Sequence, residues 1–441
     1  MNSTSVGQET MPPYPAVPVT PPAPHLRELF KPCFVDVQSG RRAGSILSLF
    51  QAGTPYELDF PALNVFLRTG MFIGDLTPFR FVRATLPDIP VVPRTTMDRE
   101  QAIDAYIELF RQSMLRCLSS HEGKPYVMGL SGGRDSRHIL LEAVRARRKP
   151  AYSYTVDLAH SPDECLLART VAERLGVQHK VVPATYDMAT EFKKNTLTDF
   201  CSLQHGWILG ARQVLSQFQQ SYDGIGGDIL SGQPARVDSR KVALVEEGRI
   251  EELAELLVSS GPLYLVKNPA LFPRREEAVA LVHAEISRHL DAVNPVKSFY
   301  FWNRTRRDIA ESAFALLVSP GQQVHAPYLD SDLFQLLASL PAQMTIDRRL
   351  HTDAMHKAFP EFANIGFASS SQVPRAFHRR LALDALGHLR SRRPGLLNKA
   401  RATVGLLRAI VQPGHAGDAR PIALRAVYLT QIWDPLEKGQ S

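Results

Sequence analysis

The sequence predicts an α/β protein built on a doubly wound parallel sheet, and three observations support this fold class. Between residues 126 and 219, short apolar runs typical of buried strands alternate with longer segments of helical character. A glycine-rich turn at residues 131–136 joins the first apolar run to a helix. A second glycine-rich turn, at residues 222–232, follows a later apolar run. In parallel sheets, ligands bind at the carboxyl ends of the strands, where such turns lie.

The first turn, Ser131-Gly132-Gly133-Arg134-Asp135-Ser136, has the features of a phosphate-binding loop. Its glycines let the backbone approach an anion without an intervening Cβ, and the first amides of the helix expected over 137–145 point toward that anion. The hydroxyls of Ser131 and Ser136 are further donors, and Asp135 can hold a magnesium ion. No lysine follows the glycines, so the turn is not of the Gly-x4-Gly-Lys-Ser/Thr type. The alternative interpretation is a turn that merely joins a strand to a helix.

A Ser-Gly-Gly-x-Asp-Ser turn after a strand resembles the pyrophosphate loop of the N-type ATP pyrophosphatases, which include the asparagine synthetases. The second turn, 222–232, is similar to the Ser-Gly-Glu-Gly-x-Asp-Glu-x-x-Gly-Gly signature of the asparagine synthetase family. The stretches 69–79 and 325–330 also resemble segments of that family. The resemblance covers roughly residues 60–375 and implies an adenine nucleotide alpha hydrolase-like fold.

The resemblance also implies a nucleotide site and a two-step reaction. Asp135 and Asp228 match the family's aspartates that bind magnesium on the pyrophosphate, so both are expected catalytic and metal-binding residues. ATP and Mg²⁺ are the expected cofactors. A carboxylate attacks the α-phosphorus of ATP to give an acyl-adenylate and pyrophosphate, and ammonia or an amine then displaces AMP to leave an amide. The other residues expected to bind the nucleotide are Leu130, Ser131, Gly132, Gly133, Ser136, Val156, Asp223 and Gly224.

Three departures from the family pattern keep a second interpretation open. Ile225 stands where asparagine synthetases have a glutamate near the acyl-adenylate, and Ile229 stands where a glutamate follows the metal aspartate. The family's late lysine has no counterpart in residues 367–372, and the cations available to replace it by a different geometry are Arg134, Lys357 and Arg375. A catalytically degenerate nucleotide-binding partner or regulatory protein is therefore the alternative to an amide ligase.

The N-terminal part differs from glutamine-dependent asparagine synthetases. Their glutaminase domain uses a cysteine at position 2, and this chain has Asn2. Residues 1–24 hold seven prolines and are expected to be disordered, whereas 25–95 is expected to be a truncated β-rich region with β-prone runs at 34–37 and 62–67. We therefore expect a ligase that does not hydrolyse glutamine itself. Its partners are a small-molecule carboxylate and free ammonia, an amine, or a separate glutaminase or carrier.

The expected elements of the ATP-binding domain, residues 96–375, follow from periodicity and from start and stop signals. Ser161-Pro162-Asp163-Glu164 opens a helix with a capping box, and Leu175-Gly176 ends it. The other expected elements are helices over 97–118, 201–219 and 333–340 and strands over 126–130, 151–156 and 177–182.

Several other side chains are candidates for the site. His205, Trp207 and Asp157 are candidates for the acceptor pocket, and for His138 a packed or a solvent-exposed position is favoured over a phosphate contact. The run Arg304, Arg306 and Arg307 lies on an expected helix and either binds an anionic substrate or forms a solvated face.

Charge and cysteine content bound the class of protein further. The formal net charge is +7, and from Arg375 onward twelve Lys and Arg face four Asp and Glu, so the excess lies in a basic helical C-terminal tail, 376–441. This tail is interpreted as a solvated surface in preference to one for an anionic carrier, a membrane or nucleic acid, and tRNA modification ranks last. Four scattered cysteines, no signal peptide and no apolar stretch approaching ~20 residues favour a cytoplasmic protein without a membrane span.

Overall fold

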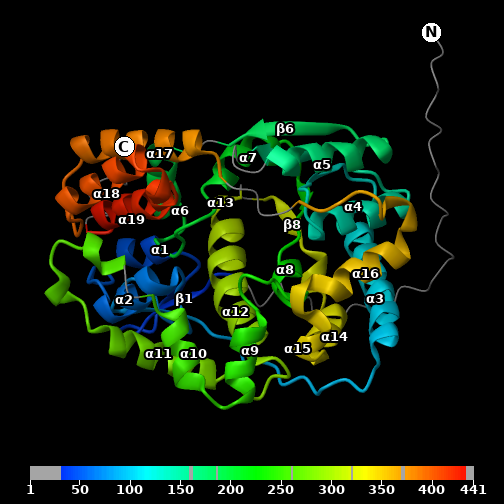
Figure 1. Ribbon diagram of the computed structural model, residues 1–441, viewed down its shortest axis with the longest axis horizontal. Helices are drawn as coiled ribbons and strands as arrows, with labels where there is room; N and C mark the ends of the chain where they lie inside the picture. Colours follow the sequence, from blue (N-terminus) through cyan, green and yellow to red (C-terminus); the bar gives the residue numbers. More distant parts are fainter. Residues whose placement is uncertain are drawn as a thin grey trace, which may run out of the picture.

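The computed structural model describes residues 31–157, 162–184, 187–259, 262–318, 321–368 and 373–433 (Figure 1). Its larger sheet has five parallel strands in the order β6-β5-β4-β7-β8. This sheet confirms the predicted doubly wound α/β class. The strands are β4 (Tyr126–Gly129), β5 (Tyr152–Asp157), β6 (His179–Pro183), β7 (Gln220–Tyr222) and β8 (Gln323–His325). The predicted disordered tail, 1–24, lies outside the described residues.

The strand order creates a topological switch point between β4 and β7. Strand β4 comes first in the chain but lies in the centre, with β5 and β6 on one side and β7 and β8 on the other. The connections after β4 and β7 therefore lead away in opposite directions and open a crevice at the carboxyl ends of these two strands. The two glycine-rich turns follow β4 and β7, so both border this crevice.

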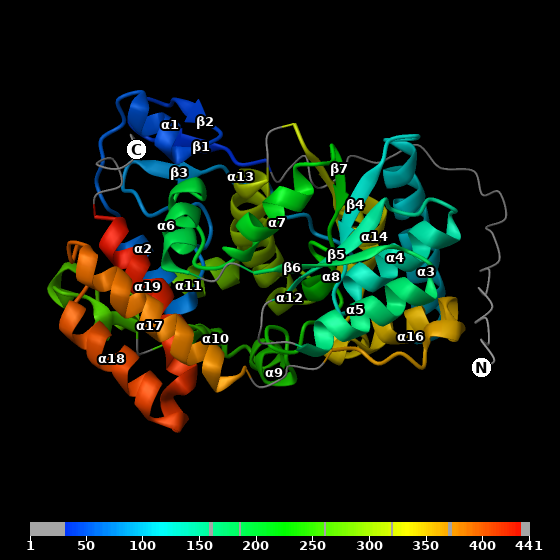
Figure 2. The same ribbon diagram turned by 90° about the horizontal axis from the view of Figure 1, so that it is seen from above.

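Helices cover both faces of the sheet (Figure 2). Tyr126 and Met128 share a core with α3 (Arg99–Ser119), α4 (Asp135–Arg145) and α5 (Pro162–Arg174). Val127 points to the opposite face, because side chains alternate along a strand, and packs with α7 (Trp207–Leu215). Burial on both faces explains why the central strand β4 reads as a nearly continuous apolar run.

Most elements predicted within residues 96–375 are confirmed, with one difference. The helix expected over 201–219 is shorter, because Asp199, Phe200 and His205 adopt left-handed backbone conformations before α7 begins. The glycine stop is confirmed, since α5 ends at Arg174 and Gly176 has φ of 61°. Ser161, the expected cap of that helix, lies outside the described residues. The other helices are α6 (Met188–Leu197), α8 (Gly227–Leu230), α9 (Ser239–Glu246), α10 (Ile250–Leu257), α11 (Arg275–Ser287), α12 (Pro295–Tyr300), a π-helix (Phe301–Phe314), α13 (Ala315–Leu317), α14 (Ser331–Ser339), α15 (Ala342–Thr345) and α16 (Arg349–Ala358).

The N-terminal region combines a small antiparallel sheet with two helices. Its strands lie in the order β2-β1-β3 and comprise β1 (Phe34–Asp36), β2 (Arg42–Ala43) and β3 (Val82–Ala84). Helix α1 spans Ile46–Gln51, and α2 spans Phe60–Thr69. The strand expected at 62–67 is therefore wrong. Asp59 caps α2 by accepting from the Ala62 amide, Pro61 fits its first turn and Gly70 ends it at φ of 82°.

The C-terminal helices pack on this N-terminal region, at the opposite end of the molecule from α3 and α4 (Figures 1 and 2). They are α17 (Arg375–Ser391), α18 (Lys399–Val411) and α19 (Ala419–Gln431). Phe66 of α2 stacks on Phe72, with ring centroids 4.1 Å apart, and contacts Tyr428 of α19 at 5.1 Å. The two ends of the described chain thus build one hydrophobic core.

Buried arginines of the π-helix tie the N-terminal region to the rest of the fold. Arg307 donates to the carbonyls of Gly74 and Leu76, and Arg306 donates to the carbonyl of Thr85. Both arginines also pair with Glu311. For these two residues the expectation of a solvated face or an anionic-substrate contact is wrong, because their charges are satisfied inside the protein. None of the helices in the described ranges combines the length and apolar character that a membrane span requires.

We predict that Phe66→Ala destabilises the protein by about 3–5 kcal/mol, because it removes a fully buried ring from the core shared by the two chain ends. Urea denaturation followed by circular dichroism measures this loss. Val404→Ala on the exposed side of α18, where the side chain is 57% exposed, is the control and should change stability by no more than about 0.5 kcal/mol. Equal effects of the two substitutions would contradict a shared core.

Candidate active site

A cavity of about 310 Å³ lies at the switch point, between the two glycine-rich turns. All of the predicted site residues except Gly132 and Gly133 line it. The lining residues from the prediction are Leu130, Ser131, Asp135, Ser136, Val156, Asp223, Gly224 and Asp228. The structure therefore brings together residues from three strand ends that are far apart in the sequence.

Hydrogen bonds inside the first turn fix its shape. The Ser131 amide donates to Ser136 Oγ at 2.9 Å, and the Gly133 amide donates to Ser131 Oγ at 3.2 Å. The two hydroxyl oxygens lie 3.1 Å apart. Leu130 lines the cavity, but its amide donates to the Tyr154 carbonyl at 2.7 Å and its carbonyl accepts from Thr155 Oγ1 at 2.5 Å. Of these two backbone groups, the carbonyl retains capacity for a ligand, since it can accept a second hydrogen bond.

Gly132 is required for packing on a later segment of the chain. A Cβ atom at this position would lie 2.7 Å from Ala368 Cβ and 3.0 Å from Glu164 Cα, so no other residue fits without a shift. The Gly132 carbonyl accepts from the Ala368 amide at 2.9 Å. Buried Arg137 donates to the carbonyls of Gly132 and Gly366 at 3.2 and 2.8 Å. The family lysine was expected within residues 367–372. The start of this stretch lies against the first glycine-rich turn, and residues 369–372 are not described.

The three cations that the sequence offered in place of this lysine lie in different surroundings. Arg134 belongs to the loop and stacks over the Phe367 ring, 4.2 Å from its centroid. Lys357 is exposed and pairs with Asp104 at 2.6 Å. Arg375 begins α17 and donates to the carbonyl of Val411 at 3.1 Å. Of the three, Arg134 is the one at the first turn.

Each candidate metal-binding aspartate is paired with an arginine from another part of the chain. Asp135 begins α4 and forms an ion pair with Arg348, and His351 Nδ1 lies 3.5 Å from the same carboxylate. Asp228 begins α8 at its second residue and lies 3.4 Å from the Arg304 guanidinium. Neither Arg348 nor His351 was identified from the sequence. Arg348 has φ of 59°, and nothing in its neighbourhood signals a position facing the first turn.

The second turn passes directly against Asp135. A Cβ atom at Gly227 would lie 2.7 Å from Asp135 Oδ1, and one at Gly224 would lie 2.9 Å from Asp135 Cβ. Burial raises the pKa of Asp135, Arg348 opposes this shift, and the negative charge of Asp228 adds to it. Burial likewise raises the pKa of Asp223 to about 7, with the charges of Asp135 and Asp228 contributing. The three carboxylates are thus close enough to repel one another.

This arrangement fits a hard divalent cation. Two carboxylates in one cleft supply the oxygen ligands that Mg²⁺ prefers, and the ion commonly takes its remaining ligands from water and substrate phosphates. Within the described ranges, no group of three or more His, Cys, Asp or Glu side chains is arranged to hold a metal ion. A site of two aspartates, completed by phosphate oxygens, is the arrangement these residues support.

The cavity is also lined by residues from α7, from the turn before it and from the π-helix. His205 and Trp207, both candidates from the sequence, line the cavity, whereas Asp157 is not among its lining residues. Sequence reasoning missed the contribution of the π-helix, which supplies Ile309 and Phe314. The remaining lining residues are Gly129, Tyr154, Thr155, Glu164, Ile225 and Gly226.

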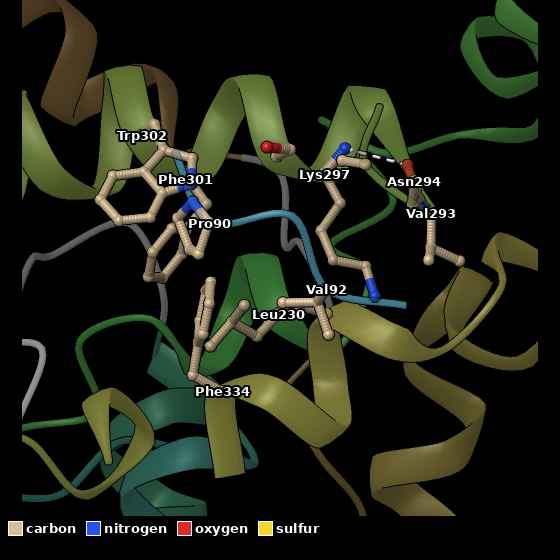
Figure 3. A pocket seen from close by; sticks show the side chains of 12 residues that line it. Pro90, Val92, Leu230, Val293, Asn294, Lys297, Phe301, Trp302 and Phe334 are labelled. Carbon is tan, nitrogen blue, oxygen red and sulfur yellow. Dashed lines mark hydrogen bonds between the residues drawn. The ribbon is translucent and has the colours of Figure 1, made fainter. Parts of the chain in front are cut away.

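A second cavity next to α8 is too small for a substrate. It has a volume of about 30 Å³, enough for a water molecule, and Figure 3 shows Lys297 and Asn294 at one end and Phe301 and Trp302 at the other. Lys297 is buried and donates from Nζ to the Leu337 carbonyl at 2.8 Å. Burial lowers the pKa of this amine to about 7.

Helix α4, which begins at the first glycine-rich turn, carries a buried pair of titratable groups. His138 stacks on Phe110, with centroids 3.9 Å apart, so of the two surroundings expected for this histidine, packing or solvent, the structure shows packing. Burial lowers the pKa of His138 to about 3 and raises that of Glu142 to about 8. Their side chains lie 3.9 Å apart, and burial favours the neutral form of each.

We predict that Glu142→Gln makes the protein less sensitive to alkaline pH. The folded-state pKa of Glu142, about 8, is above its ordinary value of 4.5, so protonation stabilises the fold and this contribution is lost as pH rises through that window. The glutamine cannot ionise. The midpoints of urea unfolding are compared between wild type and variant near pH 4.5 and near pH 8. The difference between the two proteins should change toward the alkaline end. Glu251→Gln, at an exposed residue, is the control. A constant difference would contradict burial of this carboxyl group.

Comparison with known proteins identifies the family. The family model described as asparagine synthase matches residues 105–406, which is more than half of the chain. The protein belongs to the asparagine synthase family. The resemblance noted in the two glycine-rich turns is thereby confirmed, and the family comprises amide ligases that use ATP.

Other comparisons add little to this assignment. No curated protein matches the chain. Among solved structures, NMN synthetase from Francisella tularensis is 13% identical, with a TM-score of 0.21, and the match covers 48% of this chain and 97% of that one. The fold of this asparagine synthase family member is established here by its own strand order and not by that likeness.

We predict that Gly227→Ala weakens binding of ATP with Mg²⁺ by about tenfold or more, because the added methyl group displaces the Asp135 carboxylate. Isothermal titration calorimetry measures the affinity. Gly387→Ala in α17 is a matched control, since a Cβ atom there meets nothing within 4 Å. An unchanged affinity in the Gly227 variant, with the control also unchanged, would show that the Asp135 side of the cavity does not bind the nucleotide.

Proposed function

We propose that the protein is an ATP-dependent, AMP-forming amide ligase that adenylates a small carboxylic acid and transfers ammonia or an amine to it. The observation that carries this proposal is the shared cavity of Asp135 and Asp228 at the switch point, with each aspartate paired with an arginine. Membership in a family of ATP-using amide ligases supports the reaction class. The proposal adds the adenylation step, the site residues and independence from glutamine.

In the proposed adenylation step, the first turn holds the phosphates of ATP. The amides at the start of α4 and the hydroxyls of Ser131 and Ser136 donate to phosphate oxygens. Asp135 and Asp228 would hold Mg²⁺, which when bound neutralises charge on the pyrophosphate leaving group. Val156, Asp223 and Gly224 face the rest of the nucleotide. The carboxylate oxygen of the substrate forms a bond to the α-phosphorus as the bond to pyrophosphate breaks.

Arg348 and Arg304 are our candidates for the positive charge that the family obtains from its late lysine. Each is largely buried and pairs with one of the two aspartates. Once the aspartates carry a cation, both guanidinium groups are free to pair with phosphate oxygens, to which their planar geometry is suited. Positive charge placed beside the departing pyrophosphate lowers the barrier for its release.

The alternative is a nucleotide-binding partner or regulatory protein without ligase activity. The observation that favours it is Ile225, which lines the cavity as an apolar side chain where the family has a glutamate. Such a protein would bind ATP but would not form pyrophosphate with any acid. Turnover therefore separates the two functions.

We predict ATP–pyrophosphate exchange that depends on a carboxylic acid. A panel that includes L-aspartate, L-glutamate and simple carboxylic acids is tested with ATP, Mg²⁺ and labelled pyrophosphate. Asp135→Asn and Asp228→Asn should each lower the exchange rate at least about 100-fold, because metal ions contribute several kcal/mol to such transition states. Asp353→Asn, at an exposed ion pair with Arg99, is the control and should retain the wild-type rate.

ATP binding without exchange for any acid of the panel would instead support the regulatory function. Full exchange in both aspartate variants would contradict the proposed metal site, whatever acid is used.

A further inference from the structure

We propose that His205 is the general base of the amide-forming step and that Asp308 is the residue that positions it. This inference rests on the proposed ligase function and assigns a residue to its second half-reaction. The assignment comes from a part of the cavity lining that lies outside the two glycine-rich turns. There the structure places a histidine with a buried carboxylate behind it.

The contacts of the imidazole leave one nitrogen for a ligand. His205 lines the cavity, and its Nδ1 lies 3.6 Å from Asp308 Oδ1 and 3.4 Å from Ser202 Oγ. Within the described part of the chain, these contacts through Nδ1 are the polar contacts of the ring. Nε2 is therefore the nitrogen available to an amine in the cavity. A distance of 3.6 Å suits an ion pair, and catalytic contacts of this kind often shorten when the substrate is bound.

The backbone holds His205 in an uncommon conformation. Its φ is 70°, in the left-handed region that non-glycine residues seldom adopt. The strained residue directly precedes Gly206 and the start of α7, whose first residue, Trp207, also lines the cavity. Such strain persists where the surroundings impose it, and it clusters at functional sites.

Asp308 lies on the π-helix. With hydrogen bonds from residue i to i+5, side chains four or five positions apart lie on the same side of such a helix. Arg304, Asp308 and Ile309 accordingly face the site together, and Phe314 follows one turn later. Asp308 is 5% exposed. Burial alone would raise its pKa, but the contact with His205 lowers it, which favours the ionised carboxylate beside the histidine.

The chemistry needs a base at this place. The attacking nitrogen forms a bond to the carbonyl carbon of the acyl-adenylate, and the carbon–oxygen bond to AMP breaks, with AMP taking the electron pair. The nitrogen becomes cationic as it attacks and must lose one proton. His205 Nε2 accepts that proton, and the carboxylate of Asp308 stabilises the resulting imidazolium. Ile225 cannot serve, because it carries no titratable group.

Glu164 is the competing base, since it also lines the cavity. Burial raises its pKa, a direction that leaves it able to act as a base, so position is what separates it from His205. Its backbone also lies against Gly132, at the phosphate end of the cavity. His205 instead lies beside Trp207, which also lines the cavity, and it has an anionic partner in Asp308.

The test separates the two half-reactions in the full-length protein. Wild type, His205→Gln, Asp308→Asn and Glu164→Gln are assayed with the acid of the panel that gives the fastest ATP–pyrophosphate exchange. His415→Gln, at an exposed histidine of the C-terminal region, is the control. Three rates are measured: exchange, amide formation with ammonium chloride, and hydroxamate formation with hydroxylamine. Hydroxylamine is largely unprotonated at neutral pH and reacts with acyl-adenylates without help from a base.

We expect His205→Gln to retain exchange and hydroxamate formation while amide formation falls about 100- to 10,000-fold, the usual contribution of general base catalysis. Asp308→Asn should show a smaller loss confined to the amide product. Parallel loss of all three rates in the His205 variant, or loss of amide formation in Glu164→Gln alone, would overturn the assignment. Absence of exchange in the wild type would reject the ligase function itself, so the two failures are distinguishable.

Discussion

The site depends on holding several negative charges in one crevice. At an effective dielectric constant of 20, two like charges 4 Å apart repel by about 4 kcal/mol, and a triphosphate would add to this repulsion. In this protein each of Asp135 and Asp228 has its own arginine, supplied by a separate part of the chain. Paired charges of this kind tolerate burial, whereas removal of one partner would leave an uncompensated charge in the interior.

The order of the strands makes this convergence possible. Asp135 and Asp228 lie about ninety residues apart in the sequence, yet β4 and β7 are hydrogen-bonded neighbours. Both turns therefore leave the sheet at the same edge, and the close approach of the second turn to Asp135 leaves no space for a side chain at Gly227. The glycines of the second turn are explained by this packing as much as by access for a nucleotide.

Local signals predicted the parts of the fold that local interactions determine. The first glycine-rich turn, the helix after it and the glycine stop of α5 follow from residues that lie next to one another. The strand expected at 62–67 failed because apolar composition was given more weight than the flanking signals, Asp59 and Gly70, which cap a helix. Both caps were visible in the sequence.

The residues that sequence reasoning missed owe their roles to tertiary contacts. Arg348, His351 and Asp308 have no local motif, and each reaches the site from a segment remote from the residue it contacts. Arg306 and Arg307 were placed on a solvated face or against a substrate because arginine is seldom fully buried. Their carbonyl partners lie more than 200 residues earlier in the chain, where no periodicity could indicate them.

The departures from the family pattern can be understood from where charge is placed. Ile225 and Ile229 remove two carboxyl groups from a turn that already adjoins three aspartates, which lowers the repulsion in the crevice. In the proposed ligase the corresponding chemistry then resides on other elements. Arg304 and Asp308 belong to one π-helix, and they contact Asp228 and His205 respectively. A single helix thereby contacts both a proposed metal-binding residue and the proposed base of the amide-forming step.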